Sequence, residues 1–253
     1  MDKVVPTPAD AVAGIPDGAS IAVGGFGLAG IPWALIEALL EQGAANLTVV
    51  SNNCGTDGAG LGLLLEKRRI ARVVASYIGD NNEFARQYLG GELHVELTPQ
   101  GTLAERLRAG GAGIGAFYTP TGVGTLVADG GLPWRYHPDG SVAVASPPKE
   151  VRMFAGVAMV LEEAIRTDVA LVRAAVADRH GNLVFHASAR NFNPNAAMAG
   201  RLTIAEAERL VEPGEIDPDA VHVPGVFVQR VVPLTAQQAR RKGVEKRTTR
   251  AAR

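Results

Sequence analysis

Residues 17–32 read DGASIAVGGFGLAGIP, and this stretch determines the fold expected for the chain. Asp17 and Gly18 favour a tight turn. Ser20 to Gly24 contains a short apolar run, which is typical of a buried strand. Glycines follow at once, and Pro32 predicts the start of a helix because proline is well tolerated at the first helical position. The stretch therefore predicts a strand, a glycine loop and a helix in succession.

The segments on either side extend this unit. The helix after Pro32 has an apolar face and is expected to end at Gly43, a residue type common just after a helix. Residues 47–50 read LTVV and predict a second strand. Strand, helix and strand in this order form a βαβ unit, whose two strands lie parallel in one sheet. Upstream, residues 7–14 are predicted to form a short helix with Thr7 as its N-cap.

The alternation of helices and strands continues along most of the chain. At residues 102–105, the sequence TLAE fits a capping box and predicts the start of a helix that Gly110 and Gly111 end. At residues 135–145, a Pro-Asp-Gly turn between short apolar segments predicts a β-hairpin. The other predicted elements are helices over 61–67, 83–89 and 157–165, and strands over 72–78, 93–97, 169–176 and 183–185.

Together these elements predict an α/β fold with a mostly parallel sheet, helices on both faces and a β-hairpin excursion. The sequence shows neither an internal repeat nor a clear linker, so we expect one domain over residues 1–253. Basic residues concentrate only in the tail, about 235–253, which is expected to be solvated and partly ordered. An arm that docks on a partner is the alternative interpretation of this tail.

Composition excludes several classes of protein. Apolar residues make up 47% and charged residues 20% of the 253, which is typical of a globular protein and argues against disorder. The net charge of −1 gives no reason to expect nucleic acid or an anionic membrane as a partner. With Cys54 as the single cysteine and no apolar run of signal-peptide or membrane-spanning kind, we expect a cytoplasmic location.

The loop at residues 25–30 satisfies the G-x-G-x-x-G pattern of dinucleotide sites, after a strand and before a helix. Backbone N–H groups at such a helix N-terminus attract anionic oxygens whatever the ligand. However, the second strand leads into Ser51, Asn52 and Asn53, without the acidic residue that would bind the ribose of NAD. An NAD-binding oxidoreductase is therefore a disfavoured alternative.

The longer stretch at 17–32 resembles the signature of the α subunits of family I CoA-transferases: an Asn/Asp-Gly turn, three apolar residues, Gly-Gly-Phe and then Gly-x-Pro. The resemblance runs from residue 4 to about Val232 and is nearest to the succinyl-CoA:3-oxoacid branch. The acetate or butyrate branch, with the same mechanism, is the alternative. Further segments that resemble the family are 50–53, 97–106, 116–125, 189–194 and 211–215.

This resemblance implies a ping-pong transfer of CoA from succinyl-CoA to acetoacetate through a glutamyl-CoA intermediate. In the family the nucleophilic glutamate belongs to a Ser-Glu-Asn-Gly segment of the β half, and this sequence does not contain it. The resemblance thus implies that the partner is a β subunit, in a heterodimer or an α2β2 complex. Acyl-CoA and a short-chain 3-oxoacid are the implied substrates, with no permanently bound cofactor. Glu212, beside Pro213, is expected in a surface turn and not in catalysis.

The resemblance also implies the site residues. Asn52 and Gln100 correspond to family positions that line the active site, where their amides can donate to a carboxylate or an oxyanion without adding charge. Local chemistry alone would make Asn52 a turn residue and Gln100 a partner of the backbone near Thr102. The loop is expected to approach the CoA moiety or the acyl group through backbone N–H groups of Gly24, Gly25, Phe26, Gly27, Leu28, Ala29 and Gly30.

The other residue patterns in the sequence give weaker evidence about function. The five histidines lack the spacing of metal ligands, so no metal site is predicted. Cys54 is expected to be a buried, small apolar residue. Trp33 stands where family members often have glutamate, and its bulk beside the loop is expected to affect substrate preference. A binding module that only holds a partner is the remaining non-enzymatic alternative.

Overall fold

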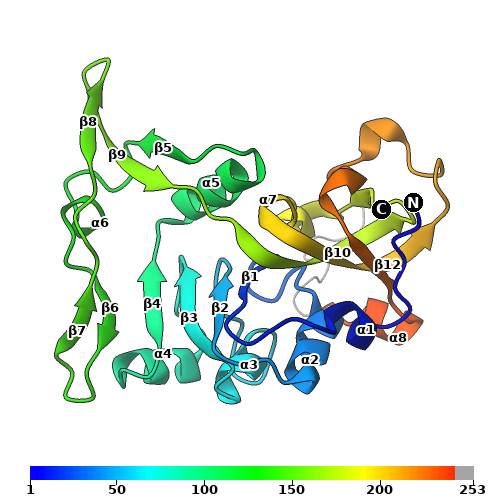
Figure 1. The fold of residues 1–253 in the computed structure, drawn as a ribbon, viewed down its shortest axis with the longest axis horizontal. Helices are drawn as coiled ribbons and strands as arrows, with labels where there is room; N and C mark the ends of the chain where they lie inside the picture. Colours follow the sequence, from blue (N-terminus) through cyan, green and yellow to red (C-terminus); the bar gives the residue numbers. More distant parts are fainter. Residues whose placement is uncertain (243–253) are drawn as a thin grey trace, which may run out of the picture.

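The computed structural model describes residues 1–242, and the part of the predicted basic tail after Lys242 lies outside the described residues. Within that range, eight strands form the central sheet (Figure 1). Their order is β13-β12-β10-β1-β2-β3-β4, with β11 antiparallel to β10 and all other neighbours parallel. The mostly parallel sheet is therefore confirmed. The strands are β1 Ser20–Val23, β2 Leu47–Val50, β3 Ile70–Ala75, β4 His94–Leu97, β10 Thr167–Asp178, β11 Leu183–Val184, β12 Gly200–Val211 and β13 Arg230–Pro233.

Helices cover both faces of this sheet, as predicted. Successive strand residues alternate between two apolar clusters: Ile21 and Val23 belong to one, and Ala22 belongs to the other. The first cluster contains residues of α1 Pro8–Val12, α2 Trp33–Gln42, α3 Gly62–Glu66 and α4 Asn82–Leu89. The second contains residues of α5 Gln100–Gly111 and α7 Asn193–Ala199. Each face of the sheet thus buries its own apolar layer.

The order of the strands creates a switch point beside β1. From β1 the chain builds outward through β2, β3 and β4, and it later returns to add β10, β12 and β13 on the other side of β1. Ligands of open α/β sheets bind outside the carboxyl ends of the strands at such a point. The glycine loop directly follows β1 and therefore lies at this position.

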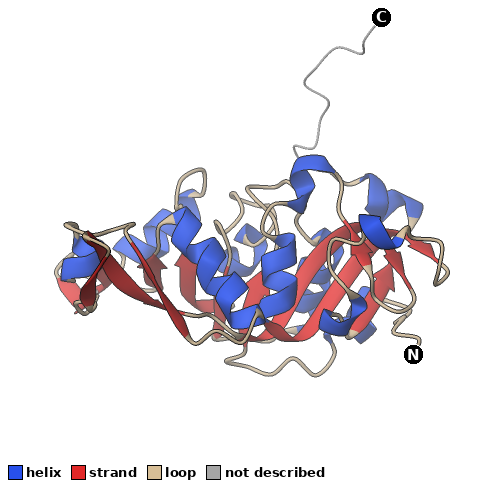
Figure 2. Ribbon diagram, turned by 90° about the horizontal axis from the view of Figure 1, so that it is seen from above, coloured by secondary structure: helices blue, strands red, loops and turns tan. Residues whose placement is uncertain are grey.

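Residues 116–163 form an excursion at one end of the molecule, with the N-terminus at the other end in both views (Figures 1 and 2). A three-stranded antiparallel sheet has the order β5-β9-β8, and β6 pairs with β7 in the hairpin predicted at 135–145. That hairpin prediction is confirmed. The elements are β5 Ala116–Thr119, α6 Leu126–Asp129, β6 Pro133–Tyr136, β7 Val142–Ala145, β8 Val151–Phe154 and β9 Val157–Glu163.

The predicted helix over 157–165 is wrong, because Val157–Glu163 is strand β9. Its alanine, methionine, leucine and glutamate residues favour a helix by intrinsic propensity. However, Ala155 and Gly156 have positive φ angles of 49° and 80°, which make a tight hairpin turn between β8 and β9. Pairing with β8 on one side and β5 on the other satisfies the backbone and overrides the propensity.

The predicted capping box at 102–105 is also wrong. Helix α5 begins at Gln100 with Pro99 as its N-cap, so Thr102 lies inside the first turn. The Thr102 hydroxyl is buried without a hydrogen-bond partner in the described structure. The φ of Pro99, −51°, already suits a helix start, so the chain turns into α5 immediately after β4.

The remaining predicted helices and strands are found within a few residues of their expected bounds. No element was predicted over β5, α6, β8, α7 or β12. The short helices are η1 Ala187–Arg190, η2 Pro218–Ala220, η3 Gly225–Phe227 and α8 Ala236–Arg240. The prediction of one domain over 1–253 stays a prediction.

The start of the predicted tail docks on the chain itself. The guanidinium of Arg241 lies 4.4 Å from the ring centroid of Trp33, at the start of α2, and also pairs with Glu37. Lys242 pairs with Glu208 of β12 at 2.7 Å. Arg241 and Lys242, which follow α8, therefore hold this helix against α2 and the sheet.

Candidate active site

A cavity of about 290 Å³ opens at the carboxyl ends of the first four strands. Each of β1, β2, β3 and β4 contributes the residues that directly follow it, because parallel strands end at the same edge of a sheet. The lining residues are Phe26, Gly27, Asn52, Asn53, Thr56, Ser76, Tyr77, Asp80 and Gln100. Of the nine residues predicted for the site, Phe26, Gly27, Asn52 and Gln100 are among them.

Asn52 and Gln100 are in direct contact. The Nε2 of Gln100 donates to the Oδ1 of Asn52 at 3.0 Å, and the Oγ of Ser76 donates to the same oxygen at 2.9 Å. Asn52 is only 2% exposed. The alternative of a Gln100 side chain bonded to the backbone near Thr102 is thus not what the structure shows. Two uncharged amides, from the ends of β2 and β4, meet at the cavity wall.

Sequence reasoning missed other lining residues: Asn53, Thr56, Ser76, Tyr77 and Asp80. Ser76 and Tyr77 follow the carboxyl end of β3, just as Asn52 follows that of β2. Ser76 also holds the Asn52 backbone, since its N and Oγ both donate to the Asn52 carbonyl at 3.0 Å. The predicted strand over 72–78 ran past the true end of β3 at Ala75, so the strand-end rule applied to it would not have found Ser76 and Tyr77.

The glycine loop presents one glycine to the cavity. The N–H of Gly27 donates to the Oδ1 of Asn53 at 3.1 Å, and Phe26 and Ala29 exchange backbone hydrogen bonds of 3.0 Å across the turn. Gly27 has a φ of +59°, and a Cβ added there would meet nothing within 4 Å. Phe26 is 48% exposed, so its ring does not anchor the strand end in the core.

Three other glycines of the loop face protein. A Cβ added to Gly24 would lie 2.0 Å from the Oδ1 of Asn193, and one on Gly30 would lie 2.5 Å from the carbonyl of Ala189. At Gly25 an added Cβ would lie 2.4 Å from the side chain of Ile31. These glycines permit close backbone packing behind the loop. Neither they nor Leu28 and Ala29 line the cavity.

The cavity is suited to binding and has few reactive groups. Among its described lining residues, Asp80 is the only acid, and none is a lysine, arginine or histidine. Cys54 lies nearby in the sequence but is buried in the apolar core, and burial raises the pKa of its thiol far above the usual range. A neutral, buried thiol is inert as a nucleophile. The prediction that Cys54 is a small buried residue is therefore confirmed.

Trp33 does not reach the candidate site. Its side chain is buried at the start of α2, beneath Arg241, and it is not among the residues that line the cavity. The expected effect of Trp33 on substrate preference therefore has no direct contact to support it. Glu212 is exposed in a turn and pairs with Arg179, as its sequence context predicted.

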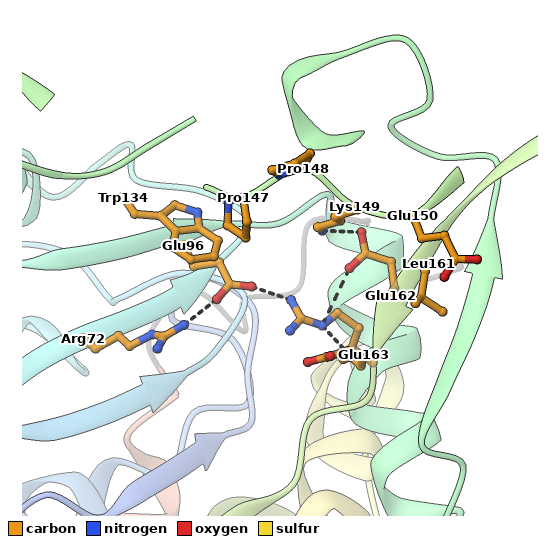
Figure 3. Close-up of a pocket in the computed structure, with 11 residues that line it drawn as sticks. Arg72, Glu96, Trp134, Pro147, Pro148, Lys149, Glu150, Leu161, Glu162 and Glu163 are labelled. Atoms are coloured by element: carbon orange, nitrogen blue, oxygen red, sulfur yellow. Dashed lines mark hydrogen bonds and ion pairs between the residues drawn. The ribbon is translucent and has the colours of Figure 1, made fainter. Parts of the chain in front are cut away.

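A second cavity, of about 350 Å³, lies between the edge strand β4 and the excursion (Figure 3). Its two buried carboxylates are already paired: Glu96 contacts Arg72 at 2.7 Å and Arg106 at 2.6 Å, while Glu162 contacts Lys149 at 2.6 Å. Charges neutralised in this way are not available to a ligand. We therefore assign this cavity a structural role, joining the excursion to the sheet.

Residues 1–242 contain neither a metal-binding cluster nor a membrane-spanning helix. No group of three or more His, Cys, Asp or Glu side chains is placed to hold a metal ion in that range. No helix among the described residues has the length and apolar character needed to cross a membrane.

Comparison with known proteins identifies the family. A family model described as Coenzyme A transferase matches residues 5–234. A Mycobacterium bovis protein, named as one subunit of a probable succinyl-CoA:3-ketoacid coenzyme A transferase, is 67% identical over 246 residues, which are 96% of this chain and 99% of that protein. The human "Succinyl-CoA:3-ketoacid coenzyme A transferase 2, mitochondrial" is 54% identical over 230 residues, which are 91% of this chain and 44% of the human protein.

Solved structures show the same fold. The apoenzyme of an acyl-CoA transferase from Escherichia coli O157:H7 has a TM-score of 0.77 and 22% identity, over 94% of this chain and 48% of that chain. At this identity the likeness concerns the fold alone. The family model, however, spans most of the sequence, and the two relatives are more than half identical. The chain therefore belongs to the Coenzyme A transferase family.

Proposed function

We propose that this chain is the α subunit of a 3-oxoacid CoA-transferase that moves CoA from succinyl-CoA to acetoacetate. One observation carries the proposal: the amides of Asn52 and Gln100 meet in a cavity at the switch point of the sheet, as the family resemblance leads one to expect. The names of the relatives at 67% and 54% identity support the choice of substrates. No observation favours the acetate or butyrate alternative.

The chemistry proposed for the site is covalent transfer to a glutamate of a β subunit. The glutamate carboxylate attacks the thioester carbonyl of succinyl-CoA, and CoA thiolate leaves to give an acyl anhydride. The thiolate then attacks the glutamyl carbonyl of the anhydride, which releases succinate and forms a glutamyl-CoA thioester. Acetoacetate reverses both steps. Each attack creates an oxyanion, and the amides of Asn52 and Gln100 are our candidate donors to it.

The same proposal includes a partner and no resident cofactor. CoA and its thioesters are substrates, which approach Phe26 and Gly27 of the glycine loop. A β subunit in a heterodimer or an α2β2 complex supplies the glutamate. In support, the match to the human relative occupies only 44% of that protein, which leaves room for a second half in the same chain. The single cysteine, Cys54, fits the cytoplasmic location that we propose.

The test is reconstitution with a candidate β subunit that carries Ser-Glu-Asn-Gly. We expect the purified chain alone to be inactive and the pair to convert succinyl-CoA and acetoacetate into acetoacetyl-CoA and succinate. The variant Asp80→Asn serves as a control, because Asp80 is the one carboxylate among the described residues that line the cavity. Transfer by the chain alone that Asp80→Asn abolishes would overturn the proposal of a partner nucleophile.

A further inference from the structure

A buried carboxylate lies behind the glycine loop. Glu206 is on β12 and is 0% exposed. Its Oε2 accepts hydrogen bonds from the backbone N–H groups of Ala34 at 2.9 Å and Leu35 at 3.0 Å. These residues are in the first turn of α2, where the N-cap position is Pro32 and no side chain of the helix's own start makes a cap. Since helix N-termini have unsatisfied N–H groups and favour negative charge, Glu206 caps α2 from inside the protein.

Arg173 on the adjacent strand β10 orients this carboxylate. Its Nη1 lies 3.3 Å from the Oε1 of Glu206, and its other side-chain nitrogens bond Glu208 at 3.1 Å and the carbonyl of Ala239 at 3.0 Å. A buried ion pair is weak evidence for a gain in stability, because proteins in which apolar residues replace such a pair are often equally stable. What such a pair supplies best is a fixed geometry. The geometry fixed here is that of the α2 N-terminus.

Hydrogen bonds from Arg173 and its neighbours also extend to the glycine loop. The backbone N–H of Arg173 donates to the Oδ1 of Asn193 at 3.1 Å, and the Nδ2 of Asn193 donates to the carbonyl of Gly30 at 2.9 Å. Asn191 adds a hydrogen bond of 3.1 Å to the carbonyl of Ala29. The end of the loop and the start of α2 are therefore both held from β10, β12, the first residue of α7 and the segment just before it.

We propose that Glu206 is a positioning residue for the glycine loop: by fixing the N-terminus of α2, it sets where Phe26 and Gly27 stand relative to Asn52 and Gln100. Only six residues separate Gly27 from Ala34, the first residue that Glu206 holds. A shift of that anchor moves the loop at the cavity. The inference rests on the proposed function, in which this loop approaches acyl-CoA.

The test compares Glu206→Gln with the matched control Glu208→Gln in the reconstituted complex at pH 8, where Glu206 is ionised although burial raises its pKa to about 7. Both changes remove one carboxylate partner of Arg173, and only Glu206 contacts α2. A glutamine at 206 has one acceptor oxygen, so it cannot serve both Arg173 and the helix. We expect Glu206→Gln to lower kcat by about 10- to 100-fold, since small misplacements of binding groups have effects of this size. Glu208→Gln is expected to keep kcat within about twofold, because the Glu208 side chain pairs with Arg173 and Lys242 and has no described contact with α2 or the loop.

Hydrogen exchange provides a readout that needs no activity. Backbone amides of residues 24–35 are expected to exchange faster in Glu206→Gln than in Glu208→Gln, at pH and temperature where both are folded. If Glu206→Gln does not fold, Glu206→Asp replaces it: the charge and Arg173 are kept, but the shorter side chain draws the carboxylate away from α2, and the same two effects are expected. Equal kcat and equal exchange in the 206 and 208 variants would overturn the inference. An inactive wild-type complex would instead overturn the proposed function, while the exchange comparison still tests Glu206.

Discussion

The Nε2 of Gln100 lies 3.0 Å from the Oδ1 of Asn52, so each amide restricts the rotamers open to the other. We expect Gln100→Ala to lower kcat by about 100-fold, with a smaller change in KM. An amide directed at an oxyanion acts mainly in the transition state, and loss of one such donor costs roughly 3 kcal/mol. Steady-state kinetics of the reconstituted complex measure both constants.

Gln100→Glu is the matched variant for this prediction, because it keeps the volume and removes the donor. It should lose about as much turnover as the alanine variant. If kcat is unchanged in either variant and only KM rises, Gln100 binds substrate without acting on the transition state.

Gly24 and Gly27 differ in what surrounds them, and substitutions should separate their roles. Gly24→Ala places a Cβ 2.0 Å from Asn193, which is overpacking of about 1–3 kcal/mol and should lower Tm. Gly27→Asn adds a side chain where nothing lies within 4 Å, and asparagine tolerates the φ of +59°. We expect this variant to keep a near-normal Tm and to lose roughly tenfold in turnover through a crowded cavity.

Gly27→Val completes the series, because a β-branched residue at positive φ adds about 1–2 kcal/mol of backbone strain. Turnover and thermal melting are to be measured on the same preparations. Full activity in Gly27→Asn would show that the loop does not approach the substrate at this residue.

Part of the site could be predicted, but through the family resemblance and not through local chemistry. The resemblance implied Asn52 and Gln100, and the structure brings their side chains together. The division among the loop glycines was not predictable. At Gly24 and Gly30 it depends on Asn193 and Ala189, which are far from the loop in sequence and reach it only through tertiary packing.

At the scale of elements, helix α2 is capped by a residue that no local sequence motif predicts. Its cap, Glu206, comes from β12, a strand that was not predicted. The prediction for β9 was wrong for a related reason. Its residues favour a helix by intrinsic propensity, but pairing with β5 and β8 makes it a strand. Strands with a clear local apolar pattern, such as β1 and β2, were predicted, whereas the state of β9 depends on pairing that overrides its helix propensity.

The capping carboxyl of α2 should make stability depend on pH. Burial raises the pKa of Glu206 from 4.5 to about 7, although Arg173 and the two backbone amides oppose this rise. Below pH 4.5 both the folded and the unfolded state hold the proton. Between pH 4.5 and 7 the unfolded state releases it while the folded state keeps it, so the free energy of unfolding falls as pH rises.

This effect should therefore lower the free energy of unfolding progressively between pH 4.5 and pH 8. Urea unfolding of the wild type and Glu206→Gln at pH 4.5, 6 and 8 measures it, because the difference between the two proteins removes the effect of most other groups. The wild type should lose stability relative to the variant as pH rises. A difference that stays constant across this range contradicts the raised pKa.

At the scale of the whole molecule, the excursion meets the central sheet through charged side chains. Glu96 and Arg72 come from β4 and β3, Arg106 from α5, and Lys149 and Glu162 from the excursion (Figure 3). Glu162 is 1% exposed, whereas Lys149 keeps partial contact with solvent. The sequence predicted an excursion from its Pro-Asp-Gly turn alone. It did not indicate this junction, which joins residues from five separate elements or loops.

Glu162→Gln should therefore weaken the attachment of the excursion. Removing one partner of a fully buried ion pair costs about 3–5 kcal/mol, and the partial exposure of Lys149 reduces our expectation to about 2 kcal/mol. For a chain of this size that corresponds to a fall in Tm of about 4–8 °C.

Glu163→Gln is the matched control, because Glu163 is exposed and only its backbone carbonyl binds Arg106. Since the junction is separate from the residues that line the candidate active site, kcat of the reconstituted complex should change little in either variant, provided that it is measured well below the lower Tm. Equal melting of the two variants would show that the Lys149–Glu162 pair does not hold the excursion, and that its contacts with α5 and β4 suffice.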